Sequence, residues 1–150
     1  MAVDDRANPM RLLVVADDQA SFFKLAEGAD ASKPIQLVPD SSLPTYERAK
    51  LARFAPLAGR QASIVDELGI HLVSLDACQE TLFINAPNID ALNYSAADNF
   101  LVACEKFNVN FPENKNLRIV ETQTGRTVAE FVWRMSAKEA LKTVKWSPDE

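Results

Sequence analysis

The side chains that could do nucleophilic or metal chemistry are few and scattered along this sequence. His71 is the only histidine, and the two cysteines, Cys78 and Cys104, lie 26 residues apart. Zinc requires three or four such ligands, so the spacing predicts no metal site. We expect His71, which lies between Ile70 and Leu72, to be a structural residue. Two cysteines are too few for a disulfide framework, and we expect free thiols.

Acidic residues offer a second kind of chemistry, because paired carboxylates can act as acid and base. The candidates are Asp17-Asp18, Asp66-Glu67 and Asp76. Each stands at the end of an expected strand, where aspartate favours turns by bonding to its own backbone. The four glycines are not closely spaced, so no phosphate-binding loop is predicted, and no G-x-S-x-G motif occurs. We therefore expect no enzymatic activity and no cofactor. A small hydrolase or oxidoreductase using His71 or the Asp17-Asp18 pair is the alternative from another class.

Charge is distributed unevenly along the chain. The formal net charge is −5, yet residues 115–145 carry +4 and the remainder −9. Such a basic stretch is typical of a surface that meets RNA or an acidic partner, although solvated strand edges and turns would give the same composition. The candidate RNA or ribosome contacts are its seven basic residues: Lys115, Arg118, Arg126, Arg134, Lys138, Lys142 and Lys145.

Length and composition indicate one globular domain. The chain has 150 residues, of which 47% are hydrophobic and 25% charged, close to the soluble average. The apolar runs are too short for a membrane helix, and the opening MAVDDRANPM does not read as a secretory signal. We expect a cytoplasmic protein without a membrane partner.

The dominant hydrophobic period is two, with turn signals recurring about every 8 to 13 residues, which predicts an all-β fold. A loop is predicted over 40–44. One or two helical turns are predicted over 136–142, with Ser136 as cap and Glu139 three residues later. The expected strands are 11–16, 20–25, 35–39, 49–55, 62–66, 69–75, 81–85, 89–94, 100–107, 117–121, 126–133 and 141–146.

Three segments repeat an aliphatic residue, an aromatic residue and a turn. They are 50–56, 91–97 and 143–149, with their aromatic positions at Phe54, Tyr94 and Trp146. A four-strand unit repeated at about 40 to 45 residues is typical of a β-propeller blade. The predicted fold is therefore a partial, WD40-like β-propeller of two and a half to three four-stranded antiparallel blades. The blades are expected at 11–39, which lacks a clear opening strand, at 49–85 and at 89–133, with the start of another at 141–150.

So few blades cannot close a ring, because known propellers need at least four. We expect an amino-terminal fragment of a longer propeller domain. Self-association through open blade faces is the other way to cover the apolar surface. Trp146, at the core-facing aromatic position of the unfinished blade, predicts a chain that oligomerises.

The segments Asn116–Phe131 and Val144–Glu150 resemble the amino-terminal propeller of eukaryotic translation initiation factor 2A. That family has Asn-Leu, an alternating strand, Thr-Gly, a second strand with Phe, a basic spacer and Trp-Ser-x-Asp-Glu. A loop before the first strand, here Phe111–Asn114, is also a family feature. The matching positions are Asn116, Leu117, Thr124, Gly125, Phe131, Trp146, Ser147, Asp149 and Glu150.

The resemblance implies a non-enzymatic role in which initiator methionyl-tRNA and mRNA engage the small ribosomal subunit. The matching residues imply the propeller fold and not a binding site. The scaffold b subunit of eukaryotic translation initiation factor 3 and a generic WD-repeat scaffold share much of the pattern and are the alternatives. Val120-Glu121 stands where WD repeats place Trp-Asp, which argues against an ordinary WD scaffold.

Overall fold

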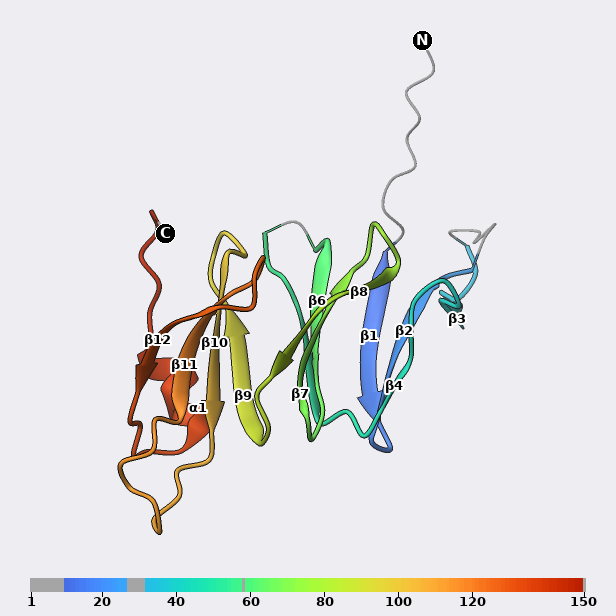
Figure 1. The fold of residues 1–150 in the computed structure, drawn as a ribbon. Coiled ribbons are helices and arrows are strands. Elements are labelled where there is room, and N and C mark those ends of the chain that lie inside the picture. The colour runs from blue at the N-terminus through green and yellow to red at the C-terminus, as the bar shows by residue number, and fades with distance from the viewer. Residues whose placement is uncertain (1–9, 27–31, 58, 150) are drawn as a thin grey trace.

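Three antiparallel sheets stand side by side like neighbouring blades (Figure 1). The computed structural model describes residues 10–26, 32–57 and 59–149, and within them the chain is almost entirely β. The first sheet contains β1 (Arg11–Ala16), β2 (Gln19–Leu25), β3 (Leu37–Pro39) and β4 (Tyr46–Glu47). The second contains β5 (Leu51–Phe54), β6 (Gln61–Val65), β7 (Gly69–Ser74) and β8 (Gln79–Asn85). The third contains β9 (Ile89–Tyr94), β10 (Phe100–Glu105), β11 (Leu117–Glu121) and β12 (Thr127–Phe131). This arrangement confirms the predicted all-β, partial β-propeller fold.

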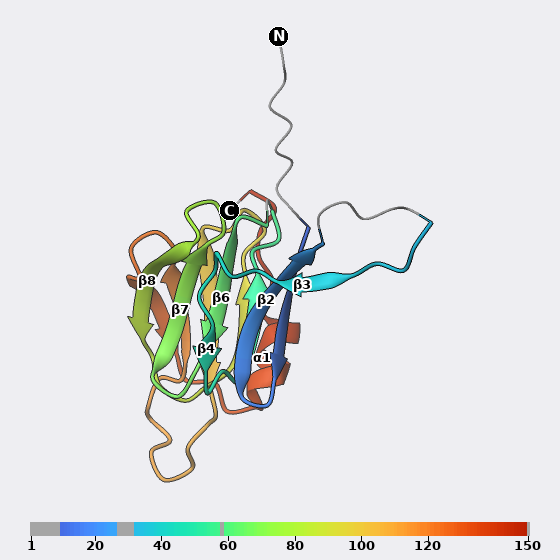
Figure 2. The same ribbon diagram turned by 90° about the vertical axis from the view of Figure 1, so that its right-hand side faces the viewer.

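The first strand of each sheet lies on its inner edge. The second and third sheets are meanders in which strands pair in chain order. β5 lies against both β1 and β9, so the inner edges of the three sheets come together, as they do around the axis of a propeller. Figure 2, turned by 90°, shows the first and second sheets stacked with their strands nearly aligned.

Two apolar cores lie between the sheets. Between the first and second sheets, Phe22 packs with Ile64 and Val73. Between the second and third, Val65 packs with Leu92 and Leu101. Each side chain of this size contributes about 1.5–3 kcal/mol when fully buried. Ile64 and Val65 are neighbours on β6 and point to opposite faces, so the middle sheet is buried on both sides.

The first sheet differs from the expected blade. β1 is a clear first strand, and the described part of the blade instead lacks a separate fourth strand at its outer edge. β3 and β4 both pair with β2, at its opposite ends, and together they form a single interrupted third strand. Among the described residues no fourth strand pairs with them.

Residues 40–45 bulge out between β3 and β4, which explains the interruption. Asp40 accepts a hydrogen bond from Arg11 Nε at 2.8 Å and others from Ser42. Burial opposes the ionisation of Asp40, but the bonds from Ser42 and Arg11 outweigh it and lower the pKa of this carboxyl. Leu43 is buried beneath the bulge, so the loop predicted over 40–44 is anchored by both polar and apolar contacts.

The strand expected over 141–146 is wrong, and the helix expected over 136–142 is confirmed. α1 (Ala137–Thr143) begins after Ser136, whose hydroxyl accepts from the Glu139 amide. Its small residues Ala137 and Ala140 pack on the outer face of the third sheet. Trp146 lies beyond the helix and stacks on Phe100, with ring centroids 6.0 Å apart. The face on which a further blade would pack is therefore covered by this carboxyl-terminal segment.

Among the described residues, no helix has the length and apolar character that a bilayer crossing requires.

Gly69, at the start of β7, generates a testable prediction about the packing of β7 on β8. A Cβ at this position would lie 2.1 Å from the carbonyl oxygen of Ile84, whereas a Cβ at Gly59 would meet nothing within 4 Å. We expect Gly69→Ala to lower the free energy of unfolding by about 3 kcal/mol, since main chain must move. Gly59→Ala should cost about 1 kcal/mol, from its φ of +59° alone. Urea unfolding measures both, and equal losses would contradict the packing described.

Candidate functional site

The seven predicted contact residues do not form one continuous strip in the structure. Lys115 and Arg126 lie at opposite ends of β11. Lys138 and Lys142 are on α1, and Arg134 and Lys145 flank it. All but Arg118 are exposed. The structure therefore divides the basic stretch among the two ends of the third sheet and the helix on its outer face.

Arg118 is engaged in ion pairs on β11. Its Nη2 lies 2.9 Å from Glu105 Oε1 on β10, and its Nε lies 3.4 Å from Glu130 Oε1 on β12. Burial raises the pKa of Glu105, and the Arg118 charge opposes that effect while the Glu130 charge adds to it. With its charge balanced by two carboxylates, Arg118 is the member of the set least free to meet a phosphate.

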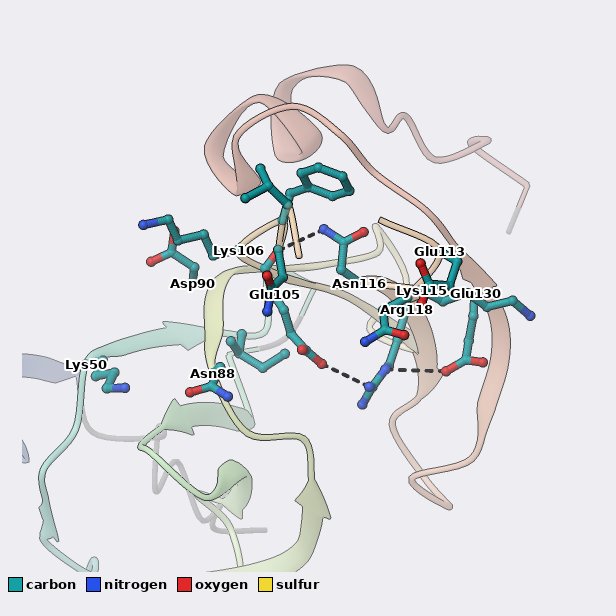
Figure 3. A pocket seen from close by; sticks show the side chains of 15 residues that line it. Lys50, Asn88, Asp90, Glu105, Lys106, Glu113, Lys115, Asn116, Arg118 and Glu130 are labelled. Carbon is teal, nitrogen blue, oxygen red and sulfur yellow. Dashed lines mark hydrogen bonds and ion pairs between the residues drawn. The ribbon is translucent and has the colours of Figure 1, made fainter. Parts of the chain in front are cut away.

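A polar cavity of about 870 Å³ lies beside Arg118, at the end of the third sheet where the loop 106–116 projects (Figure 3). Side chains of both signs line it in equal number. The cations are Lys50, Lys106, Lys115 and Arg118, and the acids are Asp90, Glu105, Glu113 and Glu130. Such a balanced cavity offers hydrogen bonds to a polar ligand but little net attraction to a polyanion.

Asn116 is one of the residues that line this cavity, and its side chain holds three strands together. Its side chain is buried; Oδ1 accepts from the Trp133 amide at 2.7 Å, and Nδ2 donates to the carbonyls of Glu105 and Trp133 at 3.1 and 2.9 Å. One side chain thus joins the ends of β10, β11 and β12. This arrangement agrees with the expectation that the motif residues build the fold.

A second cavity, of about 510 Å³, lies between β5, β9 and α1. Lys138 from the predicted set lines it together with Lys50 and Arg53, two cations that the sequence analysis missed. They lie outside the basic stretch, in the part of the chain with net negative charge, and no spacing in the sequence connects them with Lys138. Only the docking of α1 brings the three together.

His71 connects the first and second sheets. Its Nε2 lies 2.9 Å from Asp66 Oδ2 and its Nδ1 lies 2.9 Å from Glu80 Oε2. Tyr46 of β4 donates to the same Glu80 oxygen, and the rings of Tyr46 and Phe83 lie 4.8 Å from the imidazole. These contacts tie β7 to β8 and to β4 of the first sheet.

The acidic residues lie mostly in exposed turns, and the two cysteines are at least partly buried. Asp17 and Asp18 have φ of 50° and 58° and form the two-residue turn between β1 and β2, as aspartate does in type I′ turns. Asp76 is exposed, 3.8 Å from Arg60. Cys78 and Cys104 are free, and burial raises the pKa of the Cys104 thiol to about 11. Within the described ranges, no group of three His, Cys, Asp or Glu is placed to hold a metal ion.

The comparisons with known proteins show a likeness in structure. No protein-family model and no curated protein matches this sequence. Among solved structures, the chain is similar to one described as "Crystal structure of the eukaryotic initiation factor", with a TM-score of 0.67 and 16% identity over 85% of this chain. The chain spans 31% of the length of that protein. At this identity the likeness shows the fold, a partial β-propeller.

Asp66 generates a prediction about the dependence of stability on pH. Burial would raise the pKa of its carboxyl, but hydrogen bonds from His71 and from the Leu68 and Gly69 amides hold it below its usual value. A lowered pKa means that the stabilisation is present at neutral pH and is lost as the pH falls below about 4. We expect Asp66→Asn to cost about 2 kcal/mol at pH 7 and to flatten the acid limb of the stability curve.

Urea unfolding between pH 2 and pH 7 measures this effect. Asp76→Asn is the matched control, because that carboxylate is exposed and 3.8 Å from Arg60, and its removal should leave the curve unchanged. An Asp66→Asn curve that follows the wild type in parallel would show that this carboxylate does not stabilise the turn.

Proposed function

We propose that this chain is a non-enzymatic binding and scaffold protein of translation initiation, which helps initiator methionyl-tRNA and mRNA engage the small ribosomal subunit. The observation that carries the proposal is the likeness in fold to an initiation factor over 85% of the chain, at a TM-score of 0.67. The resemblance of residues 116–131 and 144–150 to factor 2A supports it independently. The cytoplasm is the compartment that such a role requires.

The proposed mechanism is surface complementarity without covalent chemistry or a cofactor. The three stacked sheets supply a rigid body, because their cores hold one another in place. Cations at both ends of β11 and around α1 would contact RNA phosphates from different sides of the third sheet. The members best suited to this contact are those that are exposed and take part in no ion pair within the described part of the chain. They are Lys115, Arg126, Arg134, Lys138 and Lys145.

Co-sedimentation tests the proposal. We expect the chain to migrate with purified small ribosomal subunits in a sucrose gradient, and more strongly when initiator methionyl-tRNA is present. The variant K115Q/R126Q/R134Q should lose about tenfold in apparent affinity, because the electrostatic contribution of phosphate contacts is lost. A chain that remains at the top of the gradient with and without tRNA would overturn the proposal.

The control for charge is K33Q/R48Q/R60Q, which removes three exposed cations from the loops of the first and second sheets and should bind normally. The same gradients separate the alternatives. Binding to the small subunit without any effect of initiator tRNA, together with capture of other factor 3 subunits, would favour the scaffold b subunit. Capture of unrelated proteins with no ribosomal subunit would favour a generic WD-repeat scaffold.

We propose further that the chain associates with a second copy through the outer face of the first sheet. The register places Leu12, Phe23, Leu25 and Leu37 on this face, and Leu12 and Leu37 are 46% and 42% exposed. β1, β2 and β3 place no charged side chain on it. Glu47 of β4 shares the face at its far end, opposite Gln19, so two copies can meet over β1 to β3 with little repulsion. The opposite end of the stack is covered by α1.

Sedimentation velocity over a range of concentrations measures this association. We expect the wild type to sediment faster as concentration rises and L12K/L37K to remain a monomer, because buried lysines at the contact would be unpaired. The control L57K/L68K changes two leucines that are each 68% exposed and lie in turns of the second sheet. A wild-type chain that is monomeric throughout would contradict the proposal.

A further inference from the structure

We infer that the groove between β5, β9 and α1 binds the phosphate groups of single-stranded RNA. This inference rests on the proposed function and names a site for it. The groove is the 510 Å³ cavity lined by Lys50, Arg53 and Lys138, and its volume lies in the range of small-ligand sites. A groove of this volume can hold part of the backbone of one nucleic-acid strand.

The groove has positive charge that is not already balanced. Lys50, Arg53 and Lys138 are exposed, and in the described part of the chain none of them takes part in an ion pair. Asp90 is the one acidic residue among the lining side chains, so three cations stand against one anion. The larger cavity nearby, which shares Lys50 and Asp90 with the groove, has equal numbers of both signs, and its Arg118 is held by Glu105 and Glu130.

The main chain adds hydrogen-bond donors to these cations. Four consecutive residues of β9, Ile89 to Leu92, line the groove. Consecutive side chains of a strand point to opposite faces, so a cavity that meets all four runs along the edge of the strand. β9 and β5 are the terminal strands of their sheets and pair only with β10 and β6. Their free edges can therefore donate main-chain N–H groups into the groove.

Cations beside free N–H groups match the chemistry of a phosphodiester. Phosphate oxygens in nucleic-acid complexes accept hydrogen bonds from Lys, from Arg and from backbone amides. Positively charged grooves that follow the backbone are the common feature of single-strand binding proteins. Leu51 and Leu141 supply apolar surface at the same groove, against which a sugar or base can pack.

Fluorescence anisotropy with a labelled oligouridine of about ten nucleotides tests the site. We expect K50Q/R53Q/K138Q to weaken binding at least about tenfold, and to reduce the slope of log K against log salt by about 2, since each single-strand phosphate contact contributes about 0.7. The control K33Q/R48Q/R60Q removes the same charge elsewhere and should bind as the wild type does. Equal losses in both variants would overturn the inference.

The variant Asp90→Asn gives a test in the opposite direction that misfolding cannot imitate. Removing the one acid of the groove should tighten RNA binding several-fold, because only attractive charges remain. Unchanged or weaker binding by Asp90→Asn would count against the site.

Inorganic phosphate alone identifies the chemistry that is recognised. In an NMR titration, phosphate should shift the amide signals of residues 89–92 in the wild type and not in K50Q/R53Q/K138Q. Polyglutamate is the competitor that separates phosphate from carboxylate, and displacement of RNA by polyglutamate at equal charge would overturn the assignment to RNA.

The experiments can reject the RNA-binding groove and the proposed function independently of each other. If the chain binds oligouridine through this groove but does not sediment with small ribosomal subunits, the site is supported and the role in initiation is contradicted. If the chain sediments with the subunits while K50Q/R53Q/K138Q binds RNA normally, the role in initiation is supported and the site is contradicted.

Discussion

The structure depends on burying both faces of the middle sheet. Ile64 and Val65, neighbours on β6, are both fully buried, and each belongs to a different core. A single antiparallel sheet of this size cannot shield two apolar faces by itself. The first and third sheets are therefore held in place by the second. The stack of three sheets positions the groove, the balanced cavity and the outer face of the first sheet.

The two ends of the stack differ in how much of their surface is covered, and this difference decides what each end can bind. At one end, α1 and Trp146 cover the third sheet. This covering also completes the groove, because Lys138 comes from the helix while Arg53 lies on β5, the inner strand of the middle sheet, and Lys50 immediately precedes that strand. At the other end, apolar side chains of the first sheet stay exposed. One end thus offers charge and the other offers apolar surface.

The tertiary structure, and not the order of residues in the sequence, decides which charged side chains lie close together. The basic stretch 115–145 is divided by the course of β11 and β12, whose turn carries Arg126 away from Lys115. Arg118, in the middle of the stretch, is balanced by Glu105 and Glu130 on the flanking strands. Cations from the acidic part of the chain, Lys50 and Arg53, instead join Lys138.

The sequence by itself determined every strand except β4, most turns and the cap of α1, because these depend on local patterns. Alternating apolar residues marked β5 to β12, and the Asp17-Asp18 pair marked the turn that its positive φ values confirm. The spacing of Ser136 and Glu139 marked the helix cap. A local pattern was misleading at 141–146, where alternation around Val144 and Trp146 serves packing on the third sheet and not strand pairing.

Tertiary structure alone decided which distant residues meet. Asp66, His71 and Glu80 lie within one sheet, but Tyr46 reaches them from another. Lys138 comes to lie beside Lys50 and Arg53 only through the docking of α1 on β9 and β10. Hydrophobic periodicity says that a face will be buried, but it carries no information on what buries it. The groove, the balanced cavity and the open first sheet are all products of that choice of partner.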